Sequence, residues 1–166
     1  MSTTRRLHVF SYLNCPENKC ILKSYPLDSV FTNLTTEFTE FEYPPNEDYP
    51  WGSFQHFNGS CNGILCFADE YTGLVILWNP SIRKFKDLSL FTKPNVPTHI
   101  HMTFGFGYDS HTDKYKVVVV LDYSMPDNIT TLENWVTYTE VKVHTLGTNI
   151  WRSIPTYPFG GVPVQI

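Results

Sequence analysis

Between Ile64 and Leu88 the chain reads ILCFADEYTGLVILWNPSIRKFKDL. It divides into three apolar or alternating segments and two polar turns: Ile64–Ala68, Asp69–Gly73, Leu74–Trp78, Asn79–Ser81 and Phe85–Leu88. Asp, Gly, Asn and Pro favour tight turns, and apolar runs this short between turns are typical of buried strands. The stretch therefore predicts a β-meander with tight connections.

The same pattern recurs on both sides of this stretch. Thr103–Tyr108 and Tyr115–Asp122 flank a polar turn at Asp109–Asp113. Apolar runs or alternation predict further strands at Leu7–Leu13, Cys20–Tyr25, Phe38–Tyr43, Trp135–Thr145 and Ile150–Ile154. We therefore expect an all-β chain built of antiparallel meanders.

The composition favours the same fold class. The 166 residues fit a single domain, and a hydrophobic content of 42% is ample for a core, although charged residues reach only 17%. Aromatic residues make up 16% of the chain, and Ala68 is its single alanine. Aromatic rings suit pleated sheets and alanine is the best helix former, so both observations favour strands over helices.

Charge and hydropathy exclude several classes of partner. The net charge is −4, and the densest basic stretch, Arg83, Lys84 and Lys86, is short. This is not the broad basic surface that binds DNA or RNA, and a charged strand edge explains the stretch at least as well. The N-terminus lacks the sustained apolar segment of a signal peptide, and no apolar run reaches the ~20 residues that span a membrane. We expect a soluble protein of a reducing compartment, with no nucleic-acid or membrane partner.

Two segments suggest an internal repeat. Leu77–Leu88 and Val143–Ile154 each contain an apolar start, a turn, a large ring, a basic residue and a final Leu or Ile. Phe85 and Trp151 correspond, at an offset of 151 − 85 = 66 residues. Repeated short β units are typical of propeller blades, whose outer strands need a bulky side chain between neighbouring sheets.

Chemical sites are few. The four cysteines, Cys15, Cys20, Cys61 and Cys66, allow either a tetrahedral zinc site or buried free thiols, and we favour the thiols because Cys66 lies inside an apolar run. His99 and His101 form a pair without a third placed ligand, and Asp109 and Asp113 suit a tight turn. No phosphate-binding loop or nucleophile elbow is present. We therefore predict no catalytic residue, metal or cofactor.

Four blocks, in order, resemble the F-box-associated domain of plant F-box proteins. They are GSCNGILC at 59–66, LWNPSIRK at 77–84, FGFGYD at 104–109 with DKYKVV at 113–118, and EVKVHTL at 140–146 with NIWR at 149–152. SYPLDS at 24–29 is also similar to the family. The motif residues, to which we assign structural roles, are Gly59, Cys61, Asn62, Gly63, Trp78, Asn79, Pro80, Gly105, Gly107, Tyr108, Asp109, Tyr115, Lys116, Val117, Trp151 and Arg152.

The resemblance implies a fold and a function. Such domains are similar to kelch-type β-propellers, and their proteins, S-locus F-box proteins among them, act as substrate receptors of SCF-type ubiquitin ligases. An F-box docks on a Skp-type adaptor, and the associated domain presents the protein to be ubiquitinated. For this chain the resemblance implies a protein-interaction module without chemistry of its own, in the cytoplasm or nucleus, whose partner is a protein substrate of unknown identity.

The chain departs from the family pattern at both ends. It contains no F-box, so a Skp-type adaptor is expected only where a longer chain supplies one. It also stops at Ile166, short of the family length. We therefore expect residues 1–166 to form one F-box-associated domain, incomplete at its C-terminus, with an open partial propeller of about three blades. The alternatives are a carbohydrate-binding or oxidoreductase propeller, and a non-functional truncated paralogue.

The sequence names no partner-binding residue. Recognition concentrates on loops carried by rigid scaffolds. The candidate loops are Pro44–Pro50, Lys93–His99 and Met125–Asn134.

Overall fold

The computed structural model describes residues 6–12, 20–32, 37–43, 56–95, 99–126 and 135–154. The chain forms two compact units, Met1–Ser53 and Phe54–Ile166, called unit 1 and unit 2. Each unit is described by itself. Within the described residues, no helix is long and apolar enough to cross a membrane.

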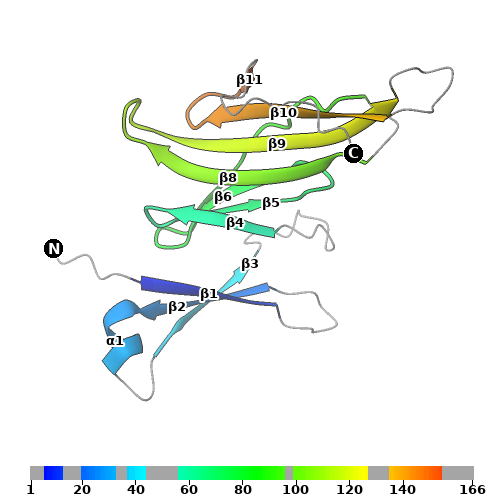
Figure 1. Ribbon diagram of the computed structural model, residues 1–166. Coiled ribbons are helices and arrows are strands. Elements are labelled where there is room, and N and C mark those ends of the chain that lie inside the picture. The colour runs from blue at the N-terminus through cyan, green and yellow to red at the C-terminus, as the bar shows by residue number, and fades with distance from the viewer. Residues whose placement is uncertain are drawn as a thin grey trace. The chain divides into compact units, whose positions relative to one another are not determined.

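Unit 1 contains one antiparallel sheet with the strand order β1-β2-β3 (Figure 1). The elements are β1 (Arg6–Tyr12), β2 (Cys20–Pro26), α1 (Leu27–Thr32) and β3 (Thr39–Tyr43). All three strands were predicted, and residues 13–19 between β1 and β2 lie outside the described residues. The helix was not predicted, since six residues are too few to show a helical period. Its last residue, Thr32, donates its hydroxyl to the carbonyl of Asp28 at 2.8 Å.

Unit 2 contains two four-stranded antiparallel sheets, in the orders β4-β5-β6-β7 and β8-β9-β10-β11. The first comprises β4 (His56–Cys61), β5 (Ile64–Ala68), β6 (Val75–Asn79) and β7 (Lys84–Asp87). The second comprises β8 (His101–Asp109), β9 (Lys114–Pro126), β10 (Trp135–Thr145) and β11 (Trp151–Ile154). The meander predicted between Ile64 and Leu88 is confirmed, and three antiparallel sheets agree with an all-β chain of about three blades.

The sequence missed one strand. Asn62-Gly63 is a strong turn signal, but no strand was expected before it, because His56–Cys61 is poor in apolar residues. The structure places β4 there, paired with β5 through Cys61 and Ile64. Asn62 (φ 49°) and Gly63 (φ 76°) both have the left-handed conformation that a two-residue hairpin turn requires. A bulge between Phe57 and Gly59 interrupts the pairing.

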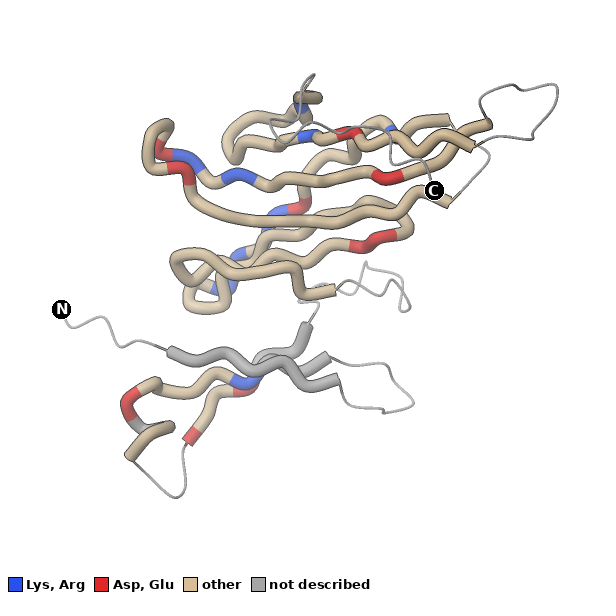
Figure 2. Tube along the Cα trace, in the orientation of Figure 1, with Lys and Arg blue, Asp and Glu red and all other residues tan. Residues whose placement is uncertain are grey.

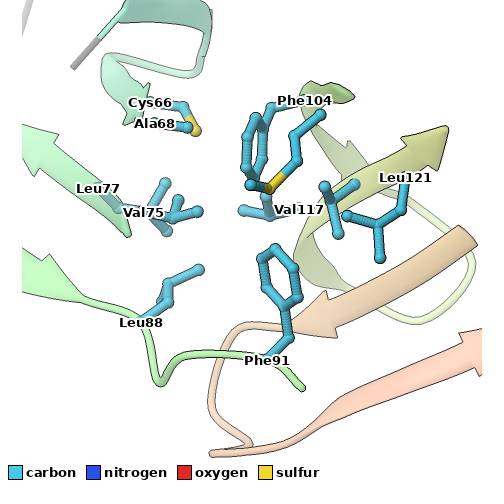
Figure 3. Close-up of a cluster of buried hydrophobic side chains, with 11 residues drawn as sticks. Cys66, Ala68, Val75, Leu77, Leu88, Phe91, Phe104, Val117 and Leu121 are labelled. Atoms are coloured by element: carbon cyan, nitrogen blue, oxygen red, sulfur yellow. The ribbon is translucent and has the colours of Figure 1, made fainter. Parts of the chain in front are cut away.

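The core of unit 2 lies between its two sheets (Figure 3). Strand alternation presents Cys66 and Ala68 of β5 to this cluster, together with residues of β6, β8 and β9. The remaining members are Val75, Leu77, Leu88, Phe91, Met102, Phe104, Val117, Val119 and Leu121. The two sheets are therefore joined by a shared apolar layer that neither could bury alone.

The first strands of the two sheets, β4 and β8, lie side by side (Figure 1). The last strands, β7 and β11, form the outer edges of the same sheets. Adjacent first strands and outward last strands are the arrangement of neighbouring propeller blades.

Candidate functional site

Unit 2 has two ends with different connections. At one end lie the tight turns β4–β5, β6–β7 and β8–β9, called the turn end. At the other lie the β5–β6 turn, the long connection from β7 to β8, and the start of the β9–β10 loop, called the loop end (Figure 1). Of the three loops nominated from the sequence, Pro44–Pro50 lies outside the described residues. Lys93–His99 and Met125–Asn134 are described in part, and both belong to the loop end.

The β5–β6 turn is built on a buried carboxylate. Asp69 Oδ1 accepts hydrogen bonds from the amides of Tyr71 at 2.7 Å and Thr72 at 3.2 Å. Gly73 has φ 78°, and a Cβ there would lie 3.0 Å from the ring of Phe91, so glycine is required on both counts. This rigid turn holds Tyr71 with 68% of its surface exposed.

The β7–β8 connection packs against this turn. Lys93 Nζ donates to the carbonyl oxygen of Tyr71 at 2.6 Å. The ring of His99 lies 5.9 Å from the ring of Tyr71, centroid to centroid. Burial lowers the pKa of Lys93, and the charge of Asp69 opposes this shift. Two segments about 25 residues apart in sequence therefore form one surface around Tyr71.

The β9–β10 hairpin extends past the end of β8, whose pairing with β9 begins at His101 and Asp122 (Figure 1). Beyond that point, and among the strands with described placement, Tyr123–Pro126 pairs only with Trp135–Tyr138. We call this two-stranded ribbon the arm. Trp135 and Tyr138 are 50% and 42% exposed. The prediction of a loop at Met125–Asn134 was therefore wrong for its first two residues, because Met125 and Pro126 belong to β9.

Hydrogen bonds and stacking stiffen the arm where it leaves the sheet. The rings of Tyr123 and Tyr138 stack with their centroids 5.7 Å apart. The hydroxyl of Tyr123 donates to Glu140 Oε1 at 2.7 Å, and Thr139 Oγ1 donates to Asp122 Oδ1 at 2.5 Å. Burial, together with the Glu140 carboxylate, raises the pKa of Tyr123 to about 12, so this phenol remains a donor at neutral pH.

The motif residues lie mainly toward the turn end. Asp109 accepts hydrogen bonds from the amide of His111 at 2.9 Å and from Thr112 Oγ1 at 2.8 Å, and pairs with Lys116 Nζ at 2.5 Å. The bond from Lys116, followed by those from Thr112 and His111, holds the pKa of the Asp109 carboxyl well below its usual range. Tyr108 donates its hydroxyl to Asp113. These groups hold the β8–β9 turn closed.

The remaining motif residues occupy strands and turns of the two sheets. Asn79 Oδ1 accepts from the amide of Ser81 at 3.1 Å beside the buried Pro80. Trp151 of β11 packs against the core cluster. The others lie on β4 (Gly59, Cys61), in the β4–β5 turn (Asn62, Gly63), on β6 (Trp78), on β8 (Gly105, Gly107), on β9 (Tyr115, Val117) and on β11 (Arg152).

The cysteines and histidines do not assemble in the described part of the chain. Cys61 and Cys66 are free thiols on paired strands, and burial raises the pKa of Cys66 to about 12. Cys15 lies outside the described residues, and only the backbone of Cys20 is described. Among residues with described placement, no group of three or more His, Cys, Asp or Glu side chains could hold a metal ion.

Comparison with known proteins agrees with this architecture. The family model of the F-box associated beta propeller domain matches residues 8–165 and so runs through both units. The F-box/kelch-repeat protein At3g23880 of Arabidopsis thaliana is 33% identical over 104 residues, which cover 63% of this chain and 26% of that protein. No solved structure matches.

Two further relatives from Arabidopsis thaliana are similar. F-box protein CPR1 is 32% identical over 131 residues, covering 77% of this chain and 30% of that protein. F-box protein At4g22390 is 30% identical over 107 residues, covering 62% of this chain and 25% of that protein. The chain thus spans between 25% and 30% of the length of these three relatives. Because the family model covers nearly the whole sequence, the chain belongs to the F-box associated β-propeller domain family.

Proposed function

We propose that this chain is a substrate-recognition module of an SCF-type ubiquitin ligase and that it binds its protein substrate through the loop end of unit 2. Membership of a domain family named for F-box proteins supports the general role. The observation that carries the site is the exposure of Tyr71, Trp135 and Tyr138 on rigid supports at the loop end. Tyr and Trp are the residues most enriched at the centres of protein interfaces.

The chemistry of the loop end suits binding. The backbone amide of Tyr71 donates a hydrogen bond to the carboxylate of Asp69, and the stacked pair Tyr123–Tyr138 fixes the base of the arm. Preordered aromatic groups lose little conformational entropy when a partner binds. In this proposal the chain contributes no bond chemistry, and the ligase to which it belongs transfers ubiquitin to the bound protein.

The proposal includes the rest of the ligase and its compartment. Where a longer chain supplies an F-box, the module for which the relatives are named, a Skp-type adaptor joins through it. The ligase then acts in the cytoplasm or nucleus. A fluorescent fusion of the chain, imaged in plant cells, is expected in one or both compartments, and confinement to a membrane-bound organelle would contradict this.

A two-stage experiment tests the function. The tagged chain is expressed in plant cells, and captured proteins are quantified for the wild type, for Trp135→Ala/Tyr138→Ala, and for Ile82→Ala, a control exposed at the turn end. We expect at least one protein that the wild type and the control capture equally and that the double variant loses about tenfold or more. That protein is then offered to a reconstituted SCF ligase in which an F-box is fused to this chain.

The expected result of the second stage is ubiquitin transfer that falls with the double variant in proportion to binding. Far-UV circular dichroism checks that all variants are folded. Capture that never depends on the arm would remove the loop end from the proposal. Capture that depends on the arm without ubiquitin transfer would leave a binding module that does not serve a ligase.

A further inference from the structure

The segment that follows β7 and the start of β11 are joined by hydrogen bonds. Trp151 Nε1 of β11 donates to the carbonyl oxygen of Ser89, just after β7, at 2.5 Å. Ser89 Oγ donates to the carbonyl oxygen of Asn149 at 3.1 Å. Residues 60 positions apart in sequence are therefore held together at the outer edge of the unit.

Two exposed aliphatic residues adjoin this junction. Leu90 follows Ser89 and is 66% exposed, and Ile150 follows Asn149 and is 53% exposed. Burying a Leu or Ile side chain contributes roughly 1.5–3 kcal/mol, so a partner that covers both would gain substantial binding energy. Their neighbours Ser89, Asn149 and Trp151 are held together by the bonds of the junction, which limits the ordering that binding requires.

The charge around the junction is positive. Lys84 and Lys86 of β7 and Arg152 of β11 are exposed, with Arg83 in the preceding turn, while Asp87 is the single acidic residue of these segments. Lys86 is close enough to His144 for its charge to lower the pKa of that imidazole. In the part of the chain that the structure describes, no ion pair involves Lys84, Lys86 or Arg152. Figure 2 shows where the charged residues lie along the trace.

This local excess is unusual for a chain whose net charge is −4. An acidic partner would be attracted to it by charge complementarity, whereas a basic one would be repelled. In the sequence, Leu90 follows Lys86 by four residues and Ile150 precedes Arg152 by two, so each aliphatic residue has a basic residue near it on its own segment.

We propose that the junction formed by Lys86, Leu90, Ile150 and Arg152, called the rim junction, binds an acidic protein segment that carries aliphatic side chains. The segment's carboxylates pair with Lys86 and Arg152, and its aliphatic side chains cover Leu90 and Ile150. Leu90 belongs to the start of the β7–β8 connection, whose later part reaches the loop end. The contact does not involve Tyr71, Trp135 or Tyr138, so it does not depend on the proposed substrate site. The competing interpretation is that the charges only protect strand edges from aberrant pairing.

Fluorescence anisotropy with a labelled peptide of alternating Glu and Leu tests the proposal on the full chain. We expect saturable binding that Lys86→Glu/Arg152→Glu weakens about tenfold or more and that added salt reduces. Leu90→Ser/Ile150→Ser should weaken binding similarly, because it removes the apolar side chains that the peptide covers. Both side chains are exposed, so the double change leaves the fold intact. Lys114→Glu, which removes an exposed positive charge at the start of β9, is the matched control and should bind as the wild type does.

Amide chemical shifts locate the contact. With the Glu-Leu peptide, the changes should centre on residues 86–90 and 149–152 and leave Tyr71 and Trp135 unaffected. Absence of saturable binding, equal loss with Lys114→Glu, or equally tight binding of a peptide of alternating Lys and Leu would each overturn the proposal. Binding of a single-stranded RNA in place of the peptide, lost in Lys86→Glu, would assign the surface to nucleic acid and also overturn it.

Discussion

Trp151 shows how one side chain joins two sheets. Its ring makes edge contacts with Phe91, at 5.1 Å between centroids, and with His144, at 5.2 Å. Its indole N–H donates to Ser89. The sequence comparison with Phe85 predicted a bulky ring between neighbouring sheets, and Trp151 fulfils this role. Phe85 does not, because it pairs with Trp78 on the face of β6 opposite to the cluster residue Leu77, and it remains exposed.

Replacing Trp151 by Phe should therefore lower stability. The change keeps a ring but leaves the carbonyl of Ser89 without its donor, at an expected cost of about 1–2 kcal/mol. Thermal unfolding followed by circular dichroism measures it. Trp135→Phe is the matched control, since Trp135 is half exposed on the arm. Its free energy of unfolding should stay within about 0.5 kcal/mol of the wild-type value. Equal midpoints for the two variants would contradict the role of the indole bond.

His144 is buried beside Trp151, and its Nδ1 has no hydrogen-bond partner among the residues that the structure describes. Burial, assisted by the charge of Lys86, lowers the pKa of His144 from its ordinary value of 6.5. The unfolded chain therefore binds this proton more readily than the folded chain does. The contribution of neutral His144 to the free energy of unfolding is therefore complete above the unfolded-state pKa. It is lost as the pH falls through about 6.5 toward the lower pKa of the folded state.

We expect the unfolding midpoint of the wild type to fall between pH 7 and pH 5 more steeply than that of His144→Gln. Midpoints measured across this range in one buffer series show the difference in slope. His111→Gln is the control, because the side chain of His111 is 96% exposed in the β8–β9 turn. Parallel curves for His144→Gln and the wild type would show that His144 does not cause the pH dependence.

At the scale of elements, the β4–β5 hairpin is defined by its turn more than by its strands. β4 contains Asn58, Gly59 and Ser60, which have weak strand preference, and yet it pairs with the strongly apolar β5 on both sides of its bulge. The left-handed conformations of Asn62 and Gly63 close the hairpin. Pairing in tertiary structure thus overrides a local preference that hid this strand in the sequence.

Gly63→Ala should destabilise the hairpin by about 1–2 kcal/mol, because a Cβ disfavours φ 76° even though no atom lies within 4 Å of it. Urea unfolding followed by tryptophan fluorescence gives the free energy. Gly105→Ala on β8 is the matched control, since that site also has open space but no positive φ, and its expected change is within about 0.5 kcal/mol. A similar loss for both variants would point to β propensity or packing in place of the turn conformation.

At the scale of the whole molecule, the core cluster lies within unit 2. Leu77 is 4% exposed and lies within this cluster. Unit 1 spans only Met1–Ser53 around a three-stranded sheet. Segments shorter than about 60 residues bury too little surface for strong independent stability. We therefore expect the chain to unfold in one transition, in line with the single domain predicted from the sequence.

Leu77→Ala should lower the free energy of unfolding by about 2–5 kcal/mol. For the wild type and for the variant, the calorimetric enthalpy should equal the van't Hoff enthalpy, as it does for a single two-state transition. Leu90→Ala is the matched control, because Leu90 is largely exposed, and it should leave the midpoint nearly unchanged. Two resolved transitions, of which Leu77→Ala moves only one, would show that units 1 and 2 unfold independently.

The sequence by itself determined the fold class, the strands of the central meanders and the family. Period-two alternation and turn residues are local properties, so Ile64–Ala68 and Trp135–Thr145 could be located to the residue. Motif residues also act within their own turns. Asp109, for example, accepts hydrogen bonds from His111 and Thr112 of the β8–β9 turn. The order of the blocks along the chain was sufficient to identify the family.

Only the tertiary structure decided which distant segments share a surface. The packing of Lys93 and His99 around Tyr71, the projection of the arm beyond β8, and the bond from Trp151 to Ser89 each depend on how strands pair and sheets pack. The period of a strand fixes the face to which a side chain belongs, but it does not specify the neighbour across an interface. For this reason the candidate loops could be named from the sequence, while the exposed aromatic residues of the loop end and the rim junction could not.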